Sequence, residues 1–298
     1  MKVLVLGREG QLARGLVEAA LGTGIQIVSI GRPEIDLTDK ASVGAVFARE
    51  HPDIVVNAAA YTAVDKAESE PAVAHAVNAL GAEYAARACA AQSIPIVHIS
   101  TDYVFDGIKD SPYLESDRTG PINVYGSTKL EGEQRVAKVC ERHVILRTAW
   151  VYSPWGTNFV KTMLRLATTR PSINVVQDQL GSPTYAPDLA RTILSLATLV
   201  VDDDDSRGWG TYHVVCSGET SWSGLAREIF RHAAQNGLPV ADVAGIAATA
   251  YPTPARRPGN SRLNCDKLRL LFGLELPDWR LGVKDCVARL AASSQAGA

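Results

Sequence analysis

Residues 2–21 combine a short apolar run, a turn with two glycines and an amphipathic helical pattern, in that order. Residues 2–6 read Lys-Val-Leu-Val-Leu, which is typical of a buried parallel strand. Gly7 and Gly10 follow in a G-x-x-G-x-x-A pattern that opens a helix. This order is typical of a dinucleotide-binding domain, because free N–H groups and the positive end of the helix dipole attract a pyrophosphate; a turn that binds nothing is the alternative. The residues predicted to bind the dinucleotide here are Gly7, Gly10, Gln11 and Leu12.

Strand and helix patterns alternate through the first half of the chain. We predict strands over 2–6, 26–30, 53–57, 95–100 and 143–147. We predict helices over 10–21, 39–50, 71–92 and 122–140. The alternation favours an α/β fold with a doubly wound parallel Rossmann sheet, in which ligands bind at the carboxyl ends of the strands. Gly7, Ala59, Thr101 and Trp150 fall at or just past such ends, so we expect them to converge.

The alternation of strand and helix patterns becomes less regular from about residue 153. Helices are predicted there over 157–169 and 221–236, and strands over 173–177 and 211–215. We therefore predict a dinucleotide-binding domain over 1–152 and a smaller, partly interleaved C-terminal domain over 153–298 that mainly binds substrate. We leave open that strands after residue 152 also join the sheet of the first domain.

Composition narrows the class of protein. The 298 residues are 46% hydrophobic and 21% charged, and the formal net charge is −2, so we predict neither a nucleic-acid nor a membrane partner. An apolar run long enough to span a membrane is missing, and the strand at 2–6 leaves no room for a signal peptide, so we predict a cytoplasmic protein. The five cysteines are scattered, and the acidic run Asp202–Asp205 is typical of a solvated loop. We therefore predict that the chain has no metal site.

Tyr125 and Lys129 stand four residues apart in a predicted helix, so a phenol and an ammonium share one face. A nearby cation favours the phenolate, so we predict that Lys129 lowers the pKa of Tyr125 from its usual value of about 10. Such a tyrosine can exchange a proton with a carbonyl oxygen, and the hydroxyl of Thr101 can hold the same oxygen. The trio is typical of ketone–alcohol interconversion with a nicotinamide cofactor. The alternatives are a surface tyrosine packed on a lysine stem and a threonine that caps a turn.

Several segments together resemble one protein family. They are residues 57–68, 100–107, 123–130, 147–152 and 257–263. In this order, over about residues 1–290, they resemble the dTDP-4-dehydrorhamnose reductase family of extended short-chain dehydrogenases/reductases. The resemblance implies NADPH-dependent reduction of the 4-keto group of dTDP-4-dehydro-L-rhamnose to dTDP-L-rhamnose, a precursor of cell-surface polysaccharide. NADH is the second candidate for the cofactor.

The resemblance and the local sequence also imply roles for single residues. Tyr125 is the general acid, and Lys129 holds the nicotinamide ribose. The second strand ends without an acid that would bind the ribose 2′-hydroxyl of NAD, whereas Arg32 there can meet a 2′-phosphate, unless it is only an exposed loop residue. The further residues implied for the cofactor are Asp36, Leu37, Ala58, Ala59, Ala60, Tyr61 and Thr62. Those implied for the substrate are Thr101, Asp102, Trp150, Arg257 and Asn260. Turn chemistry for Asp102, a core position for Trp150 and a solvated basic loop for Arg257 are the alternatives.

Two rival functions and the oligomeric state stay open. A sugar-nucleotide dehydratase or epimerase would share the fold, but dehydratases that resemble this chain place Asp-Glu after the threonine, and here Thr101-Asp102 precedes Tyr103. A non-catalytic regulatory subunit would not need the trio. Some members of the family resemble dimers in which a metal ion joins the two subunits through glutamates of the first helix. Arg14-Gly15 occupies that region here, so we predict no metal and leave a homodimer open.

Overall fold

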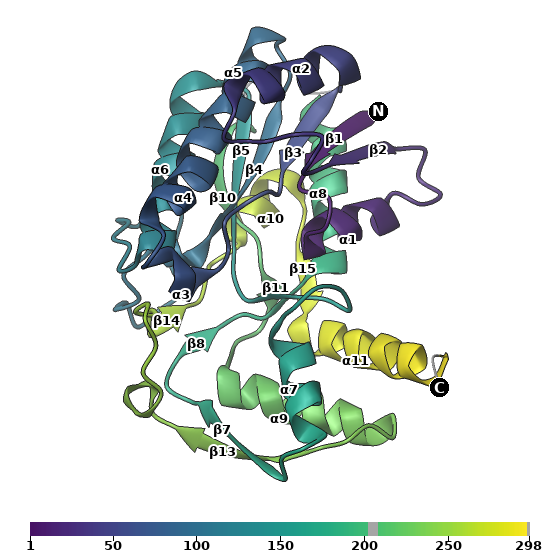
Figure 1. Ribbon diagram of the computed structural model, residues 1–298, viewed down its shortest axis with the longest axis vertical. Coiled ribbons are helices and arrows are strands. Elements are labelled where there is room, and N and C mark those ends of the chain that lie inside the picture. Colours follow the sequence, from purple (N-terminus) through teal and green to yellow (C-terminus); the bar gives the residue numbers. More distant parts are fainter. Residues whose placement is uncertain (202–207, 297–298) are drawn as a thin grey trace.

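The computed structural model describes residues 1–201 and 208–296, and within them six parallel strands form one central sheet. The strands in spatial order are β10 (Gly210–His213), β5 (His143–Thr148), β4 (Ile96–Thr101), β3 (Ile54–Asn57), β1 (Lys2–Leu6) and β2 (Gln26–Ile30). The register pairs Val3 with both Ile27 and Ile54, and it pairs Thr101 with Thr148. Chain order reverses beside β1, which is where a doubly wound sheet leaves a crevice for a ligand. The predicted fold class is confirmed (Figure 1).

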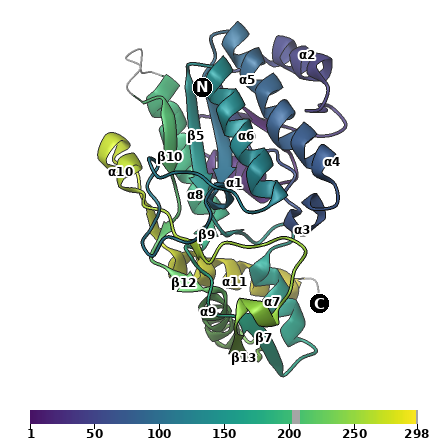
Figure 2. The same cartoon turned by 90° about the vertical axis from the view of Figure 1, so that its left-hand side faces the viewer.

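Helices cover both faces of the sheet because side chains alternate along its strands. Val3 and Val5 pack on the side of α1 (Gln11–Ala19) and α8 (Ala186–Val201). Leu4 and Leu6 face the opposite side. The elements that cover that side are α2 (Lys40–Glu50), α5 (Ala82–Ala91) and α6 (Val124–Val139) (Figure 2).

The helix predicted over 71–92 is helical throughout but not uniform. It consists of α4 (Pro71–His75), the π-helical segment η1 (Ala76–Gly81) and α5. The short helix α3 (Val64–Ala67) precedes it, and the 3₁₀ turn η2 (Asp102–Val104) follows β4. These short elements border the crevice, and π turns of this kind occur often at functional sites.

The later elements lie mainly below the sheet, at its carboxyl edge (Figure 1). The predicted helices are present as α7 (Phe159–Ala167) and α9 (Trp222–Gln235), and the predicted strand 173–177 is β7 (Ser172–Val176). The remaining elements of this half of the chain are β6 (Val151–Tyr152), β8 (Leu180–Gly181), β9 (Thr184–Tyr185), β11 (Cys216–Ser217), β12 (Thr220–Ser221), β13 (Asp242–Ile246), η3 (Ala248–Ala250), β14 (Asn260–Ser261), α10 (Asp266–Phe272), β15 (Leu276–Asp278) and α11 (Trp279–Ala296). Of these, α10 packs beside β10.

The chain returns to the central sheet after residue 153. Strand β10 extends its edge, and α8, which the sequence did not predict, packs on α1. The C-terminal half is thus interleaved with the sheet. The acidic run Asp202–Asp205 lies outside the described residues. Among the helices that the structure describes, none is both long and apolar enough to cross a membrane.

Candidate active site

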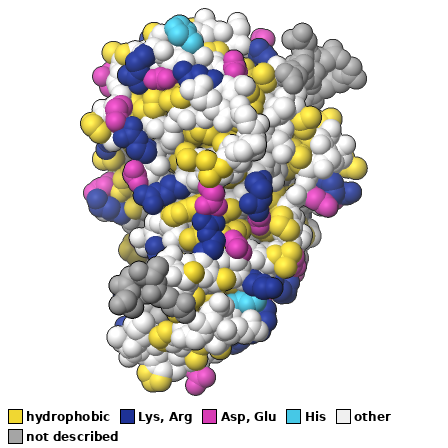
Figure 3. Space-filling view, turned by 90° about the vertical axis from the view of Figure 1, so that its right-hand side faces the viewer, with side chains coloured by type: hydrophobic (Ala, Val, Ile, Leu, Met, Phe, Trp, Pro, Cys, Tyr) yellow, Lys and Arg dark blue, Asp and Glu magenta, His cyan; other side chains and the backbone are white. Residues whose placement is uncertain are grey.

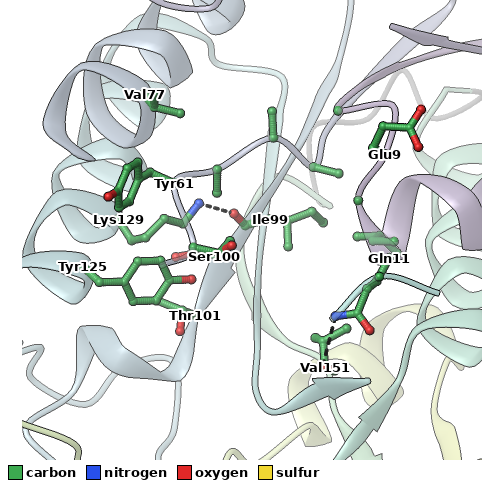
Figure 4. A pocket seen from close by; sticks show the side chains of 18 of the residues that line it. Glu9, Gln11, Tyr61, Val77, Ile99, Ser100, Thr101, Tyr125, Lys129 and Val151 are labelled. Atoms are coloured by element: carbon green, nitrogen blue, oxygen red, sulfur yellow. Dashed lines mark hydrogen bonds between the residues drawn. The ribbon is translucent and has the colours of Figure 1, made fainter. Parts of the chain in front are cut away.

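A cavity of about 1130 Å³ opens at the carboxyl ends of the strands. It brings together most of the residues that the sequence predicts for the site, from elements far apart in the chain (Figure 4). Those residues are Gly7, Gly10, Gln11, Leu12, Arg32, Asp36, Leu37, Ala58, Ala59, Ala60, Tyr61, Thr62, Thr101, Asp102, Tyr125, Lys129 and Trp150. Arg257 and Asn260 are not part of the cavity wall that the described residues form.

The glycine turn has the geometry of an anion site. Gly7 adopts a φ of +114°, which disfavours other residues, and a Cβ there would lie 3.2 Å from the Ala59 nitrogen. Gly10 stands at the N-cap of α1 without a side-chain cap, and a Cβ there would meet nothing within 4 Å. Gly10, Gln11 and Leu12 line the cavity, so the start of α1, whose first N–H groups have no partner within the helix, borders the space that a pyrophosphate would fill. The chain thus fits a dinucleotide at this end of the cavity.

The side chain of Gln11 links the glycine turn to the second half of the chain. Its amide donates to the Val151 carbonyl at 3.3 Å (Figure 4). Its oxygen accepts from Ser153 Oγ and Asn158 Nδ2, both at 2.8 Å. Because these contacts engage both ends of the side-chain amide, a contact of Gln11 with a dinucleotide would come from its backbone.

The predicted catalytic trio lies on two neighbouring elements. Thr101 ends β4, and Tyr125 and Lys129 occupy successive turns of α6. Asn123 fixes the start of α6, because its Oδ1 accepts from the Gly126 nitrogen at 2.7 Å and its Nδ2 donates to the Arg256 carbonyl at 2.8 Å. The hydroxyl of Tyr125 points toward Thr101 (Figure 4).

The electrostatics of the pair Tyr125 and Lys129 differ from the prediction. Burial raises the pKa of Tyr125 to about 12, although the Thr101 hydroxyl opposes the rise. Burial lowers the pKa of Lys129 to about 8, and Glu133 opposes that change. The Lys129 ammonium donates to the Ile99 carbonyl at 2.5 Å (Figure 4). The predicted lowering of the Tyr125 pKa by Lys129 is therefore wrong: burial disfavours the phenolate, and the ammonium is directed at the backbone of β4.

Asp102 and Trp150, which are predicted to bind the substrate, also line the cavity. Asp102 is buried, which raises its pKa to about 6, and Thr101 Oγ1 donates to its Oδ1 at 3.0 Å. Trp150 has a φ of +49° and stacks on Trp222 with ring centroids 3.6 Å apart. A Cβ on Gly181 would lie 2.6 Å from the Trp150 ring, so this ring packs against both Trp222 and Gly181, and Trp150 also lines the cavity.

Arg257 and Asn260 bind other parts of the protein. Arg257 forms a bidentate ion pair with Asp65, with Nη2–Oδ2 at 2.8 Å and Nη1–Oδ1 at 3.0 Å. Asn260 is buried and donates to the carbonyls of Lys109 at 2.7 Å and Ser111 at 2.9 Å. Its Oδ1 accepts from Arg262. These contacts hold Asn260 against the neighbouring loop, and a direct substrate contact of Asn260 or Arg257 stays a prediction.

Comparisons with known proteins agree with this geometry. The model of the RmlD substrate binding domain matches residues 1–292. A dTDP-4-dehydrorhamnose reductase of Sinorhizobium fredii is 48% identical over 279 residues, which cover 94% of each chain. The chain belongs to the dTDP-4-dehydrorhamnose reductase family. A solved structure of this family from Clostridium acetobutylicum superposes with a TM-score of 0.90 at 38% identity, over 97% of this chain and 99% of that one. Another, from Bacillus anthracis in complex with NADP, has a TM-score of 0.89 at 36% identity and the same coverage.

Arg8 and Trp222 also line the cavity, although neither was predicted from the sequence as a site residue. Arg8 pairs with Glu34 at 2.7 Å and lies against Gly31, where a Cβ would come within 3.0 Å of the Arg8 Cβ. Its place inside the glycine turn was a visible signal, because a cation there is close to any bound phosphate. Trp222 gave no such signal, since only the fold brings it against Trp150.

Proposed function

We propose that this protein reduces the 4-keto group of dTDP-4-dehydro-L-rhamnose to give dTDP-L-rhamnose, with NADPH as the preferred cofactor and NADH as the second candidate. The observation that carries the proposal is one cavity with a glycine turn at one end and Thr101, Tyr125 and Lys129 at the other. Its relatives act on the same sugar nucleotide by name, and a similar solved structure holds NADP.

The proposed roles follow from the chemistry of each side chain. NADPH supplies a hydride to the ketone carbon when it is bound. With a pKa of about 12, Tyr125 is protonated at neutral pH, so it acts as the proton donor to the ketone oxygen. The Thr101 hydroxyl donates its one proton to Asp102 here, and it turns to donate to the ketone oxygen when the substrate binds. Lys129 binds the nicotinamide ribose. Gly7, Gly10 and the start of α1 hold the pyrophosphate.

The substrate side of the proposal rests on the residues around the trio. Asp102 and Trp150 border the cavity and contact the sugar nucleotide. Arg257 is a candidate for its diphosphate, although it also pairs with Asp65. We further propose a cytoplasmic location, because the described cysteines are free thiols, which persist in a reducing compartment. A homodimer stays a prediction that the molar mass in solution would test.

The test is NADPH oxidation with dTDP-4-dehydro-L-rhamnose, compared with other 4-keto sugar nucleotides, and NMR of the product. We expect turnover, a preference for this substrate and a product reduced at C4. An epimerase would instead retain nicotinamide through purification and consume none. Absence of turnover with every ketone would contradict the proposal and favour a non-catalytic role.

A further inference from the structure

A third ionisable residue continues the series that Tyr125 and Lys129 begin on α6. Glu133 lies four residues beyond Lys129, so the three side chains share one helix face. Lys129 is 1% exposed and Glu133 is 4% exposed. A buried carboxylate is costly unless it has partners, and Glu133 is not part of the described cavity wall, so contact with a ligand does not explain it.

Arg147 holds Glu133 in a fixed position. It precedes the last residue of β5 and is itself only 5% exposed. Its Nε lies 2.9 and 3.2 Å from the two carboxylate oxygens, and its Nη2 lies 2.7 Å from Oε2. The guanidinium also packs over the Phe105 ring at 5.1 Å. This bidentate pair fixes the carboxylate on the helix face that carries Lys129.

We propose that Glu133 is a positioning residue for the proposed reduction: its carboxylate, anchored by Arg147, keeps the ammonium of the buried Lys129 charged at the cavity wall, where it donates to the Ile99 carbonyl. The inference rests on the proposed function only for the role of Lys129 in binding the cofactor.

The charges around Lys129 support this assignment. On its own helix it faces Tyr125 and Glu133, and the sheet adds Arg147 from β5 and His98 from β4. Burial, with Lys129 as a further cause, holds the pKa of His98 well below its usual value, so this ring is neutral. Asp102 lies on the other side of Tyr125 and acts on that phenol. Burial lowers the pKa of Lys129 to about 8, and within the described residues Glu133 is the group that opposes it.

The test measures the titration of Lys129 directly, by NMR of the lysine Cε carbons in the cofactor-free protein, with Lys129→Met for assignment. Glu133→Gln should lower the Lys129 midpoint by about 1 pH unit or more, because an opposite charge beside it is lost. Glu133→Asp should restore most of the midpoint. Glu131→Gln is the matched control, since Glu131 lies on the same helix but pairs with Arg135 and His75. It should leave the midpoint unchanged.

A second variant covers the case in which Glu133→Gln, with Arg147 left unpaired, fails to fold. Glu133→Met/Arg147→Met replaces the pair by apolar side chains, a change that buried ion pairs often tolerate. It should also lower the midpoint, because among the described residues Glu133 favours the charged form of Lys129, whereas Arg147 is not among the groups that shift this pKa. The alkaline limit of NADPH binding should move with the midpoint in every variant.

An unchanged Lys129 midpoint in the folded variants would overturn the proposal and leave the ion pair a purely structural role, visible only as a lower melting temperature. Because the titration needs no turnover, it separates this outcome from failure of the proposed function. If the midpoint shifts but the wild type reduces no ketone, the proposed reaction is wrong and the coupling of Glu133 to Lys129 stands.

Discussion

The Lys129 ammonium lies 2.5 Å from the carbonyl oxygen of Ile99, two residues before the end of β4. This contact ties the lysine of α6 to the strand that carries Thr101 and fixes the ammonium at the cavity wall. It also explains why the lysine is not available to lower the pKa of Tyr125. In this arrangement we expect the lysine mainly to bind the cofactor.

Lys129→Met should weaken NADPH binding and slow turnover together. The variant removes one charge-assisted contact with the ribose, so the Kd for NADPH should rise by a factor on the order of 10–100. Fluorescence titration of the free enzyme and steady-state kinetics would measure the two effects. A variant that binds NADPH as tightly as the wild type would show that the lysine does not contact the cofactor.

Arg32→Ala should weaken NADPH use selectively. Arg32 is exposed and its ion pair with Asp36 is long, at 3.4 Å, so little energy is lost when the guanidinium turns to a 2′-phosphate. We expect kcat/KM to fall with NADPH and to change little with NADH. Arg49→Ala, at another exposed arginine with an acidic neighbour, is the control. Equal losses with both cofactors would refute the specificity argument.

Arg257→Ala should raise KM for the sugar nucleotide by a factor on the order of 10–100, with little change for NADPH, if this arginine meets the diphosphate. The ion pair with Asp65 supplies the control. Asp65→Ala frees Arg257 without removing it, so it should not raise KM for the substrate. Equal effects of the two variants would show that the pair only docks the loop onto α3.

Asp102→Asn should change how stability depends on pH. The ordinary carboxyl pKa is 3.8 and burial raises it to about 6, so the folded protein retains a proton between these values that the unfolded chain loses. Ionisation therefore destabilises the folded wild type progressively as pH rises from about 4 to 6. The asparagine variant lacks this penalty.

The difference in the free energy of unfolding, Asp102→Asn minus wild type, should grow by about 2–3 kcal/mol across that window. Urea unfolding at several pH values would measure it. Asp106→Asn should show little change across this window and the opposite trend below about pH 4, because a hydrogen bond from Tyr113 lowers the pKa of that carboxyl. A difference for Asp102→Asn that is independent of pH would contradict the assignment.

The fold and the cofactor end of the cavity could be predicted because they depend on local patterns. Apolar runs such as 2–6 predict buried strands, and parallel strands place their carboxyl ends at one edge of the sheet. Gly7, Ala59 and Thr101 therefore converge although about ninety residues separate the first from the last. The family could also be predicted, because its motifs occur in order along the whole chain.

The remaining features depend on contacts between distant segments or on burial. Arg257 and Asp65 are 192 positions apart, so no local spacing could reveal their ion pair. The spacing of Tyr125 and Lys129 predicts a shared helix face but not the degree of burial, and burial is what raises the pKa of Tyr125. Similarly, the sequence predicts a strand over 211–215, but it does not predict that this strand, β10, pairs with β5 at the edge of the central sheet. That pairing follows only from the packing of the whole sheet.

The most direct test of the account compares NADPH oxidation by the wild type and by Tyr125→Phe, with dTDP-4-dehydro-L-rhamnose as substrate and with NADPH affinity measured in parallel. The phenylalanine variant keeps the ring and loses the proton donor. We predict that kcat falls by about 10²–10⁴ while the Kd for NADPH stays nearly unchanged. A Tyr125→Phe variant that keeps most of its activity would contradict the assignment of Tyr125 as the proton donor.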